Sequence, residues 1–158
     1  MKYLLTVLIL SFSISTTQAD DIKDFQIEGI SIGDSALDFY SKEIITQNYK
    51  DWYEPKYSVS TMIEQRRLYD EIQLVYKRND SKYKIVAISA LKFTDNKSCN
   101  IKLDEISDEI SNMFGKSVKK SNKKKSKHWQ DKSGKSKVTD IFFKLKKDKD
   151  EIVVACYD

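Results

Sequence analysis

The sequence predicts an α+β protein in which an antiparallel sheet carries two amphipathic helices. Two observations predict it: apolar residues recur at helical spacing in two segments, and they alternate in the segments that follow each of them. The order is helix, three strands, helix, then two or three strands, an order that tandem duplication of one α-β-β-β unit would produce. With 158 residues, 40% of them hydrophobic, the chain has the composition of an ordinary globular protein.

Residues 1–19 predict a secretory signal peptide. Lys2 precedes an apolar run from Leu4 to Ile14, and Thr17-Gln18-Ala19 is a small-residue cleavage site. The run is shorter than the roughly 20 residues of a membrane-spanning helix, so no transmembrane anchor is expected after cleavage. An uncleaved anchor is the alternative. We therefore expect residues 20–158 to form one exported domain, periplasmic or secreted.

The first half of that domain, residues 25–98, contains one predicted helix and three strands. Residues 25–32 alternate as a short strand or extended lead-in. A helix is predicted over 35–46, with Asp34 as its N-cap and with one apolar face made by Leu37, Tyr40, Ile44 and Ile45. After irregular residues 48–56, alternation predicts strands at 57–63, 72–76 and 83–93. The last strand, with alternate residues from Tyr83 to Phe93 on one face, is apolar on both faces, which favours a central place in the sheet.

The second half, residues 99–158, repeats this pattern. A helix ending at Gly115 is predicted by an apolar face of Leu103, Ile106, Ile110, Met113 and Phe114. Residues 141–145 and 152–156 predict two strands, and a weaker pattern predicts a third around 127–130. A lysine-rich loop, 116–137, is expected between the helix and the strands.

Both cysteines, Cys99 and Cys156, lie in the portion predicted to be exported. An even number of cysteines in an oxidising compartment predicts one disulfide bond. Closing the chain between them would stabilise the fold by about 4 kcal/mol on the chain-entropy estimate. Two buried free thiols are the alternative.

Few residues suit catalysis. Gly33-Asp34-Ser35 resembles the tripeptide that carries the nucleophilic serine of GDS-type esterases and lipases, and this resemblance implies an Asp-x-x-His motif near the C-terminus. The single histidine, His128, has Lys125 three residues before it instead. One histidine and two cysteines also provide few metal ligands, and no Gly-rich phosphate loop occurs. We therefore predict no catalytic residue, metal or cofactor; a serine esterase is a remote third hypothesis.

Residues 116–137 carry ten lysines and one acidic residue, Asp131, whereas the rest of residues 20–158 has a net charge of −6. Lysines on flexible stems suit non-specific attraction of anionic lipid or a polyanion. The absence of arginine from this segment argues against specific nucleic-acid readout. A solvated loop and a docking site for an acidic protein are the alternatives. The candidate anion-binding residues are Lys119, Lys120, Lys123, Lys124, Lys125, Lys127 and Trp129.

A second candidate surface is aromatic. Trp52, Tyr53 and Tyr57 lie close together in the sequence, and Tyr40 precedes them in the predicted helix. Core packing is the usual fate of such residues, but exposed aromatic side chains also form the centres of many protein interfaces. Trp52, Tyr53 and Tyr57 are therefore candidate partner-binding residues.

Residues 32–37 (IGDSAL) and the segment from Leu103 to Gly115 resemble elements of two families, the SmpA/OmlA-type outer-membrane lipoproteins and the tandem-repeat β-lactamase inhibitor proteins. Their short helix ends at a Leu-Gly or Phe-Gly pair; the first unit here lacks that glycine, and the lipobox cysteine is absent. The segment IEGISIGDS also resembles uncharacterised exported bacterial proteins. The resemblance implies a non-catalytic protein that binds a protein partner in the bacterial envelope or outside the cell. An anionic-surface binder acting through residues 116–137 is the alternative function.

Overall fold

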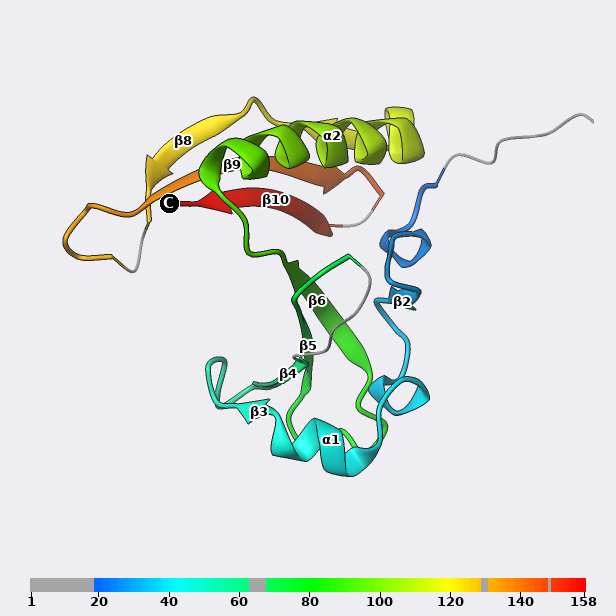
Figure 1. The fold of residues 1–158 in the computed structure, drawn as a ribbon. Coiled ribbons are helices and arrows are strands. Elements are labelled where there is room, and N and C mark those ends of the chain that lie inside the picture. The colour runs from blue at the N-terminus through cyan, green and yellow to red at the C-terminus, as the bar shows by residue number, and fades with distance from the viewer. Residues whose placement is uncertain (1–18, 63–67, 129–130, 148) are drawn as a thin grey trace, which may run out of the picture.

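The computed structural model describes residues 19–62, 68–128, 131–147 and 149–158. It confirms an α+β fold built from antiparallel sheets, in two layers (Figure 1). Of the two expected helices only the second is long. The predicted signal peptide lies outside the described residues except for Ala19, and it stays a prediction. No helix in the described ranges is long and apolar enough to cross a membrane.

The lower layer in Figure 1, here the α1 unit, is a short helix beside a four-stranded sheet. Its strand order is β3-β4-β5-β6, a simple meander. One face of β5 is buried, with Ile72 and Leu74 in a core that also contains Ile45 of the helix. The elements are α1 (Lys42–Gln47), β3 (Tyr49–Lys50), β4 (Tyr57–Met62), β5 (Glu71–Lys77) and β6 (Ile85–Leu91).

The upper layer, the α2 unit, has the same order of helix followed by antiparallel strands. Its elements are α2 (Asn96–Phe114), the single turn η3 (Gly115–Ser117), β7 (Val118–Lys120), β8 (Lys124–Lys127), β9 (Lys137–Leu145) and β10 (Glu151–Tyr157). β9 is central, with β10 along one edge and β7 and β8 in succession along the other. A second core lies between α2 and the sheet, where Phe114 and Phe143 are fully buried. The helix ends at Gly115, as predicted, where φ is +46°.

The predicted disulfide bond lies in this second core. The Sγ atoms of Cys99 and Cys156 are 2.11 Å apart, and Cys156 is buried. The bond joins the first turn of α2 to β10. It therefore fixes the helix on the sheet at the end opposite to Gly115.

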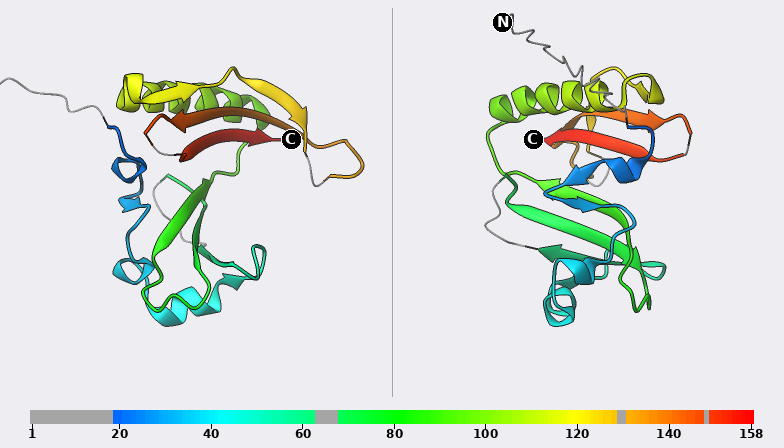
Figure 2. Two further views of the ribbon diagram at one scale, coloured as in Figure 1. Left: turned by 180° about the vertical axis from the view of Figure 1, so that it is seen from behind. Right: turned by 90° about the vertical axis from the view of Figure 1, so that its right-hand side faces the viewer.

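The N-terminal strap, residues 19–40, connects the two layers along one side of the molecule (Figure 2). It contains η1 (Ile22–Asp24), the two-residue strands β1 (Gln26–Ile27) and β2 (Ile30–Ser31), and η2 (Ala36–Asp38). Ile22 is buried in the core of the α2 unit, whereas Ile30 is buried in the core of the α1 unit. Each core thus contains an isoleucine from the same short segment.

The helix predicted over 35–46 is divided into η2 and α1. Asp34 is not its N-cap, because the Asp34 carboxylate accepts from the Ser31 amide at 2.8 Å instead. Ser35 caps η2, and Ser41 caps α1 by accepting from the amide of Ile44. A second capping serine inside the apolar pattern therefore restarts the helix.

Strand β6 lies at the edge of its sheet, so the prediction of a central strand was wrong. Its outer edge is not free at the start, because the strap pairs with it there: Gly33 donates to the Ile85 carbonyl and Ile85 donates to the Asp34 carbonyl, both at 2.9 Å. A register shift opposite Val75 and Tyr76 also divides the predicted face. Ile85 consequently faces the core while Ala87 is exposed.

The lysine-rich segment 116–137 is not one continuous loop, because two parts of it form the edge of a sheet. Residues 118–120 and 124–127 are strands because they pair with β9, which satisfies their backbone groups. Of the strand predicted around 127–130, only Lys127 lies in a strand, as the last residue of β8; His128 lies outside it, and residues 129–130 lie outside the described part of the chain.

Replacing Ile22 with alanine should lower the free energy of unfolding by about 2–5 kcal/mol, because it opens a cavity in the core of the α2 unit. Urea unfolding followed by circular dichroism measures the change. Leu37→Ala, in the same strap but 41% exposed, is the matched control and should cost about 1 kcal/mol or less. Equal effects of the two substitutions would contradict a strap that is anchored through Ile22.

Candidate functional site

The three aromatic residues predicted to bind a partner have different environments. Trp52 and Tyr53 lie in the loop between β3 and β4 and are 54% and 52% exposed. Tyr57 begins β4 and is half-buried, with the Nζ atom of Lys56 5.0 Å from its ring centroid. Tyr40, by contrast, is buried in the core of the α1 unit. The exposed part of the stretch is therefore Trp52 and Tyr53.

Two further aromatic side chains are more exposed than these, and sequence reasoning did not single them out. Phe93, in the connection between β6 and α2, is 70% exposed, and Tyr157, in β10, is 69% exposed. Phe93 had been assigned to a strand face, and Tyr157 lies just beyond the predicted last strand. Their position at the ends of alternating runs was the available signal.

Asp70 holds the backbone at Phe93. Its carboxylate accepts from the Lys92 ammonium and from the Phe93 amide, each at 2.7 Å. The hydrogen bond from Lys92, followed by that from the Phe93 amide, lowers the pKa of Asp70. The exposed ring is thus attached to a fixed stretch of chain.

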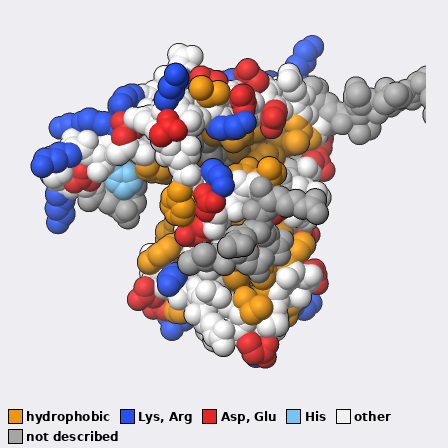
Figure 3. All heavy atoms as spheres, in the orientation of Figure 1, with side chains coloured by type: hydrophobic (Ala, Val, Ile, Leu, Met, Phe, Trp, Pro, Cys, Tyr) orange, Lys and Arg blue, Asp and Glu red, His pale blue; other side chains and the backbone are white. Residues whose placement is uncertain are grey.

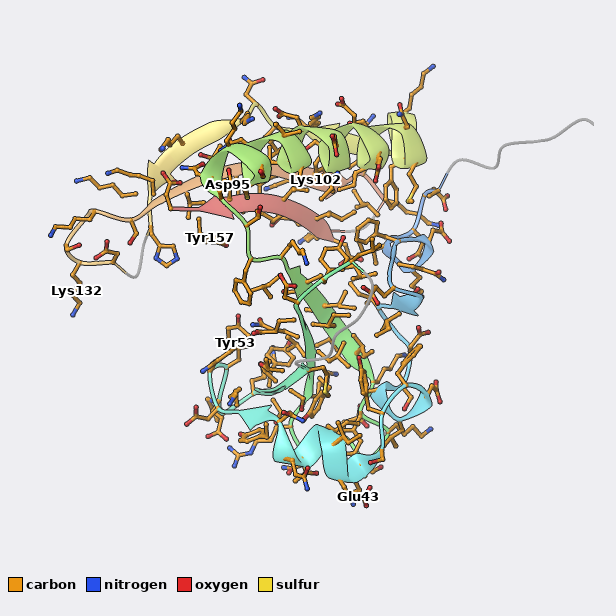
Figure 4. The ribbon with its side chains drawn as sticks, in the orientation of Figure 1. Glu43, Tyr53, Asp95, Lys102, Lys132 and Tyr157 are labelled. Carbon is orange, nitrogen blue, oxygen red and sulfur yellow. A yellow bond between two sulfur atoms is a disulfide. The ribbon has the colours of Figure 1, made fainter. Side chains whose placement is uncertain are left out.

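We call Trp52, Tyr53, Phe93 and Tyr157 the aromatic surface. Figure 4 shows Tyr53 and Tyr157 on the same side of the molecule, one on each layer. The connection that carries Phe93 runs between the layers on that side (Figure 1). In the space-filling view, hydrophobic side chains border a hollow beneath the projecting part of the upper layer (Figure 3). The two layers together therefore present a concave, partly aromatic side.

Three of the candidate anion-binding lysines form ion pairs with carboxylates of their own unit. Lys123 bonds to Asp104 at 2.9 Å and Lys120 to Asp108 at 3.4 Å, both on α2. Lys125 bonds to the side chain of Asp158 at 2.8 Å, and this hydrogen bond lowers the pKa of Asp158. These lysines hold the β7–β8 edge against the helix and against the end of the chain after β10, and part of their charge is neutralised.

The other candidate lysines, Lys119, Lys124 and Lys127, are exposed and form no ion pair with any described residue. Trp129 lies outside the described residues. Figure 4 shows Lys132 at the tip of the hairpin between β8 and β9, and Figure 3 shows Lys and Arg side chains concentrated on this projecting arm. The arm is therefore a basic surface that adjoins the aromatic surface.

The residues considered for an esterase are not brought together. The Ser35 hydroxyl donates to the Lys82 carbonyl at 2.7 Å and accepts from the Leu37 amide, both in the lower layer. His128 follows β8 in the upper layer, where its ring lies 5.5 Å from that of Tyr157. Among the described residues no group of three or more His, Cys, Asp or Glu side chains could hold a metal ion.

An open pocket of about 550 Å³ lies at one end of the α1 unit, outside the sites predicted from the sequence. Glu54 joins its walls, since its carboxylate accepts from the Tyr49 hydroxyl and pairs with Arg78 at 3.3 Å. The turn after β5 contributes Arg78 and Asn79 to this pocket. Its lining is polar and aromatic: Thr46, Tyr49, Glu54, Ser58, Tyr76, Arg78, Asn79, Asp80, Ser81 and Tyr83.

No family model, curated protein or solved structure matches the chain.

The loop at the tip of the basic arm should loosen in acid. The Asp131 carboxylate accepts from the Ser133 hydroxyl at 2.6 Å and from the amides of Ser133 and Ser136, which holds its pKa far below the ordinary value. A lowered pKa stabilises the loop above the unfolded value of about 4, and this contribution is lost as the pH falls toward the folded value. We expect the protection of the Ser133 and Ser136 amides, which is the slowing of their exchange relative to that of an unstructured peptide at the same pH, to decrease as the pH falls below about 4.

Nuclear magnetic resonance of these two amides makes the measurement. Asp131→Asn should already show the faster exchange at pH 7, whereas Asp38→Asn, an exposed change far along the chain, should leave it unchanged. Protection that persists in Asp131→Asn would contradict the role of the carboxylate.

Proposed function

We propose that the protein is an exported, non-catalytic binding protein whose aromatic surface contacts a protein partner in the envelope or outside the cell. The observation that carries this proposal is the exposure of four large aromatic side chains, each more than half accessible, on elements of both layers. Exposed aromatic residues are the commonest centres of binding energy in protein interfaces.

The backbone beneath these side chains supports the proposal. Trp52 and Tyr53 lie between two paired strands, and the Asp70 carboxylate fixes the chain at Phe93. Tyr157 belongs to a paired strand and contacts His128 through its ring. A backbone fixed in this way loses little conformational entropy when a partner binds. Export is supported by the disulfide bond, which is typical of an oxidising compartment.

The test is site-specific photo-crosslinking in the source cells, followed by affinity measurement with the captured protein. A photoreactive residue at Tyr53 should capture a defined partner, and one at Leu37 should not. Trp52→Ala should then raise the dissociation constant by about 30-fold, the effect of losing about 2 kcal/mol at an interface hot spot. Leu37→Ala, also exposed, should change it less than about threefold.

Two results would contradict this function. One is equal capture at Tyr53 and Leu37, which would indicate random collisions. The other is an unchanged dissociation constant for Trp52→Ala when circular dichroism shows that the variant is folded, because the contact would then not use the aromatic surface.

The basic arm supports a second candidate function, binding of an anionic lipid surface or polyanion. The specific observation is that Lys119, Lys124 and Lys127 are exposed and form no ion pair with the described residues. Reversing Lys119 and Lys124 to glutamate should weaken retention on anionic vesicles or heparin and reduce its salt dependence between about 50 and 300 mM. Lys42→Glu on α1 is the control. No retention of the wild type at low salt would exclude this function for the arm.

A further inference from the structure

The pocket of the α1 unit opens at the end of its sheet that lies away from the α2 unit. It is formed where β4 begins and β5 ends, whereas the connection from β6 to α2 leaves the opposite end of the sheet. Figure 1 shows α1 and β3 at this outer end. Thr46, Asn79 and Ser81 in its lining are exposed. The pocket is therefore open to solvent, and it shares no lining residue with the aromatic surface or the basic arm.

One wall of the pocket is fixed by the core of the α1 unit. Tyr76 lines the pocket but is only 5% exposed. Its hydroxyl lies 2.8 Å from the Ser60 hydroxyl, which donates to the Ile45 carbonyl at 2.8 Å, so Tyr76 is the donor of the first bond. The Tyr83 ring packs edge-on against the Tyr76 ring, with the centroids 5.1 Å apart. Two tyrosine rings are thus held in place before any ligand binds.

The turn on the other side of the pocket has an unusual backbone conformation. The Asp80 carboxylate accepts from the amides of Lys82 and Lys84, both at 3.0 Å, and so fixes this turn. Two lining residues of the turn, Asn79 and Tyr83, have φ of +63° and +47°. Asparagine adopts this left-handed region readily, but a bulky aromatic residue rarely does. Backbone strain of this kind clusters at ligand-binding sites, where it positions side chains.

The charged groups in the lining are paired within the protein. The Glu54 carboxylate accepts from the Tyr49 hydroxyl and pairs with Arg78 at 3.3 Å, and the Asp80 carboxylate is occupied by the two turn amides. An ionic ligand would have to compete with these pairs. The lining nevertheless presents both donors and acceptors, from hydroxyl, amide, guanidinium and carboxylate groups, next to the apolar faces of tyrosine rings.

We propose that this pocket binds a neutral saccharide. Each hydroxyl group of a saccharide both donates and accepts, as the mixed lining requires, and the sugar ring has an apolar face of C–H bonds that packs on an aromatic ring. Tyr49, which is 37% exposed, provides that ring, while Arg78 and Asn79 donate to hydroxyl groups. The volume of about 550 Å³ lies within the range of about 300–1,000 Å³ that is typical of small-molecule sites. Saccharide binding here is independent of partner binding through the aromatic surface.

Titration of the isotope-labelled, oxidised protein with neutral trisaccharides, followed by nuclear magnetic resonance, tests the proposal. The probes are maltotriose, cellotriose, mannotriose and N-acetylchitotriose. At least one should shift the amide resonances of residues 78–83 saturably, with a dissociation constant of about 0.1–5 mM. Tyr49→Ala should raise this constant by at least roughly fivefold, because it removes the exposed ring and its hydroxyl. Lys50→Ala, at the next residue of β3 and outside the lining, is the matched control and should change it less than about twofold.

If Tyr49→Ala fails to fold, Asn79→Gly provides the second test. Glycine adopts a positive φ readily, so this change removes the side-chain amide while keeping the turn, and it should weaken binding by at least roughly threefold. Phe93→Ala should leave the affinity unchanged, which separates this site from the aromatic surface.

Three results would overturn the proposal. The first is the lack of saturable shifts with every trisaccharide up to about 20 mM. The second is a shift of residues 78–83 with citrate or spermidine but with none of the saccharides, because the occupant would then be an ion. The third is an unchanged saccharide affinity in a folded Tyr49→Ala or Asn79→Gly variant.

Discussion

Completion of two separate cores by one short segment is the constraint on which the rest of this fold depends. Neither sheet is large, and each is covered by helix on one side, so each unit alone buries limited apolar surface. The strap adds Ile22 to one core and Ile30 to the other, and it also covers the start of β6. Since one continuous stretch of chain serves both cores, the relative position of the layers is coupled to the packing inside each of them.

The periodic elements could be predicted from the sequence because their cause is local. Alternation along β5 corresponds to a buried face, and so does the helical face that ends at Gly115, except that Met113 is exposed. The place of β6 could not be predicted, because apolar residues on both faces do not distinguish a central strand from an edge strand whose outer edge is bonded by Gly33 and Asp34, about fifty residues earlier in the chain. The division of the first helix depended on which of several serines and acids capped it, a choice that local sequence leaves open.

The candidate surfaces, too, could be predicted from the sequence only in part. The sequence identified Trp52 and Tyr53 by their clustering and the basic arm by its charge, but it could not distinguish the exposed Trp52 from the buried Tyr40. The backbone at Phe93 is held by the carboxylate of Asp70, which is 23 residues away in the sequence. The neutralisation of Lys123 and Lys120 by α2 likewise required the helix and the strands to be placed side by side. A count of lysines along the sequence therefore overestimates the positive charge that the folded segment presents to a partner.

The position of the disulfide bond in the sequence limits when it can form during synthesis and export of the chain. Cys99 opens α2, whereas Cys156 lies in β10, with three strands of the same sheet between them in the sequence. When the chain emerges with its N-terminus first, β3 to β6 can already pair while Cys156 has not yet appeared. Until β10 has emerged, the Cys99 thiol stays reduced and can form a disulfide only with a thiol of another molecule. The core that contains Ile22 is likewise incomplete until then, because β10 contributes Ile152 and Cys156 to it.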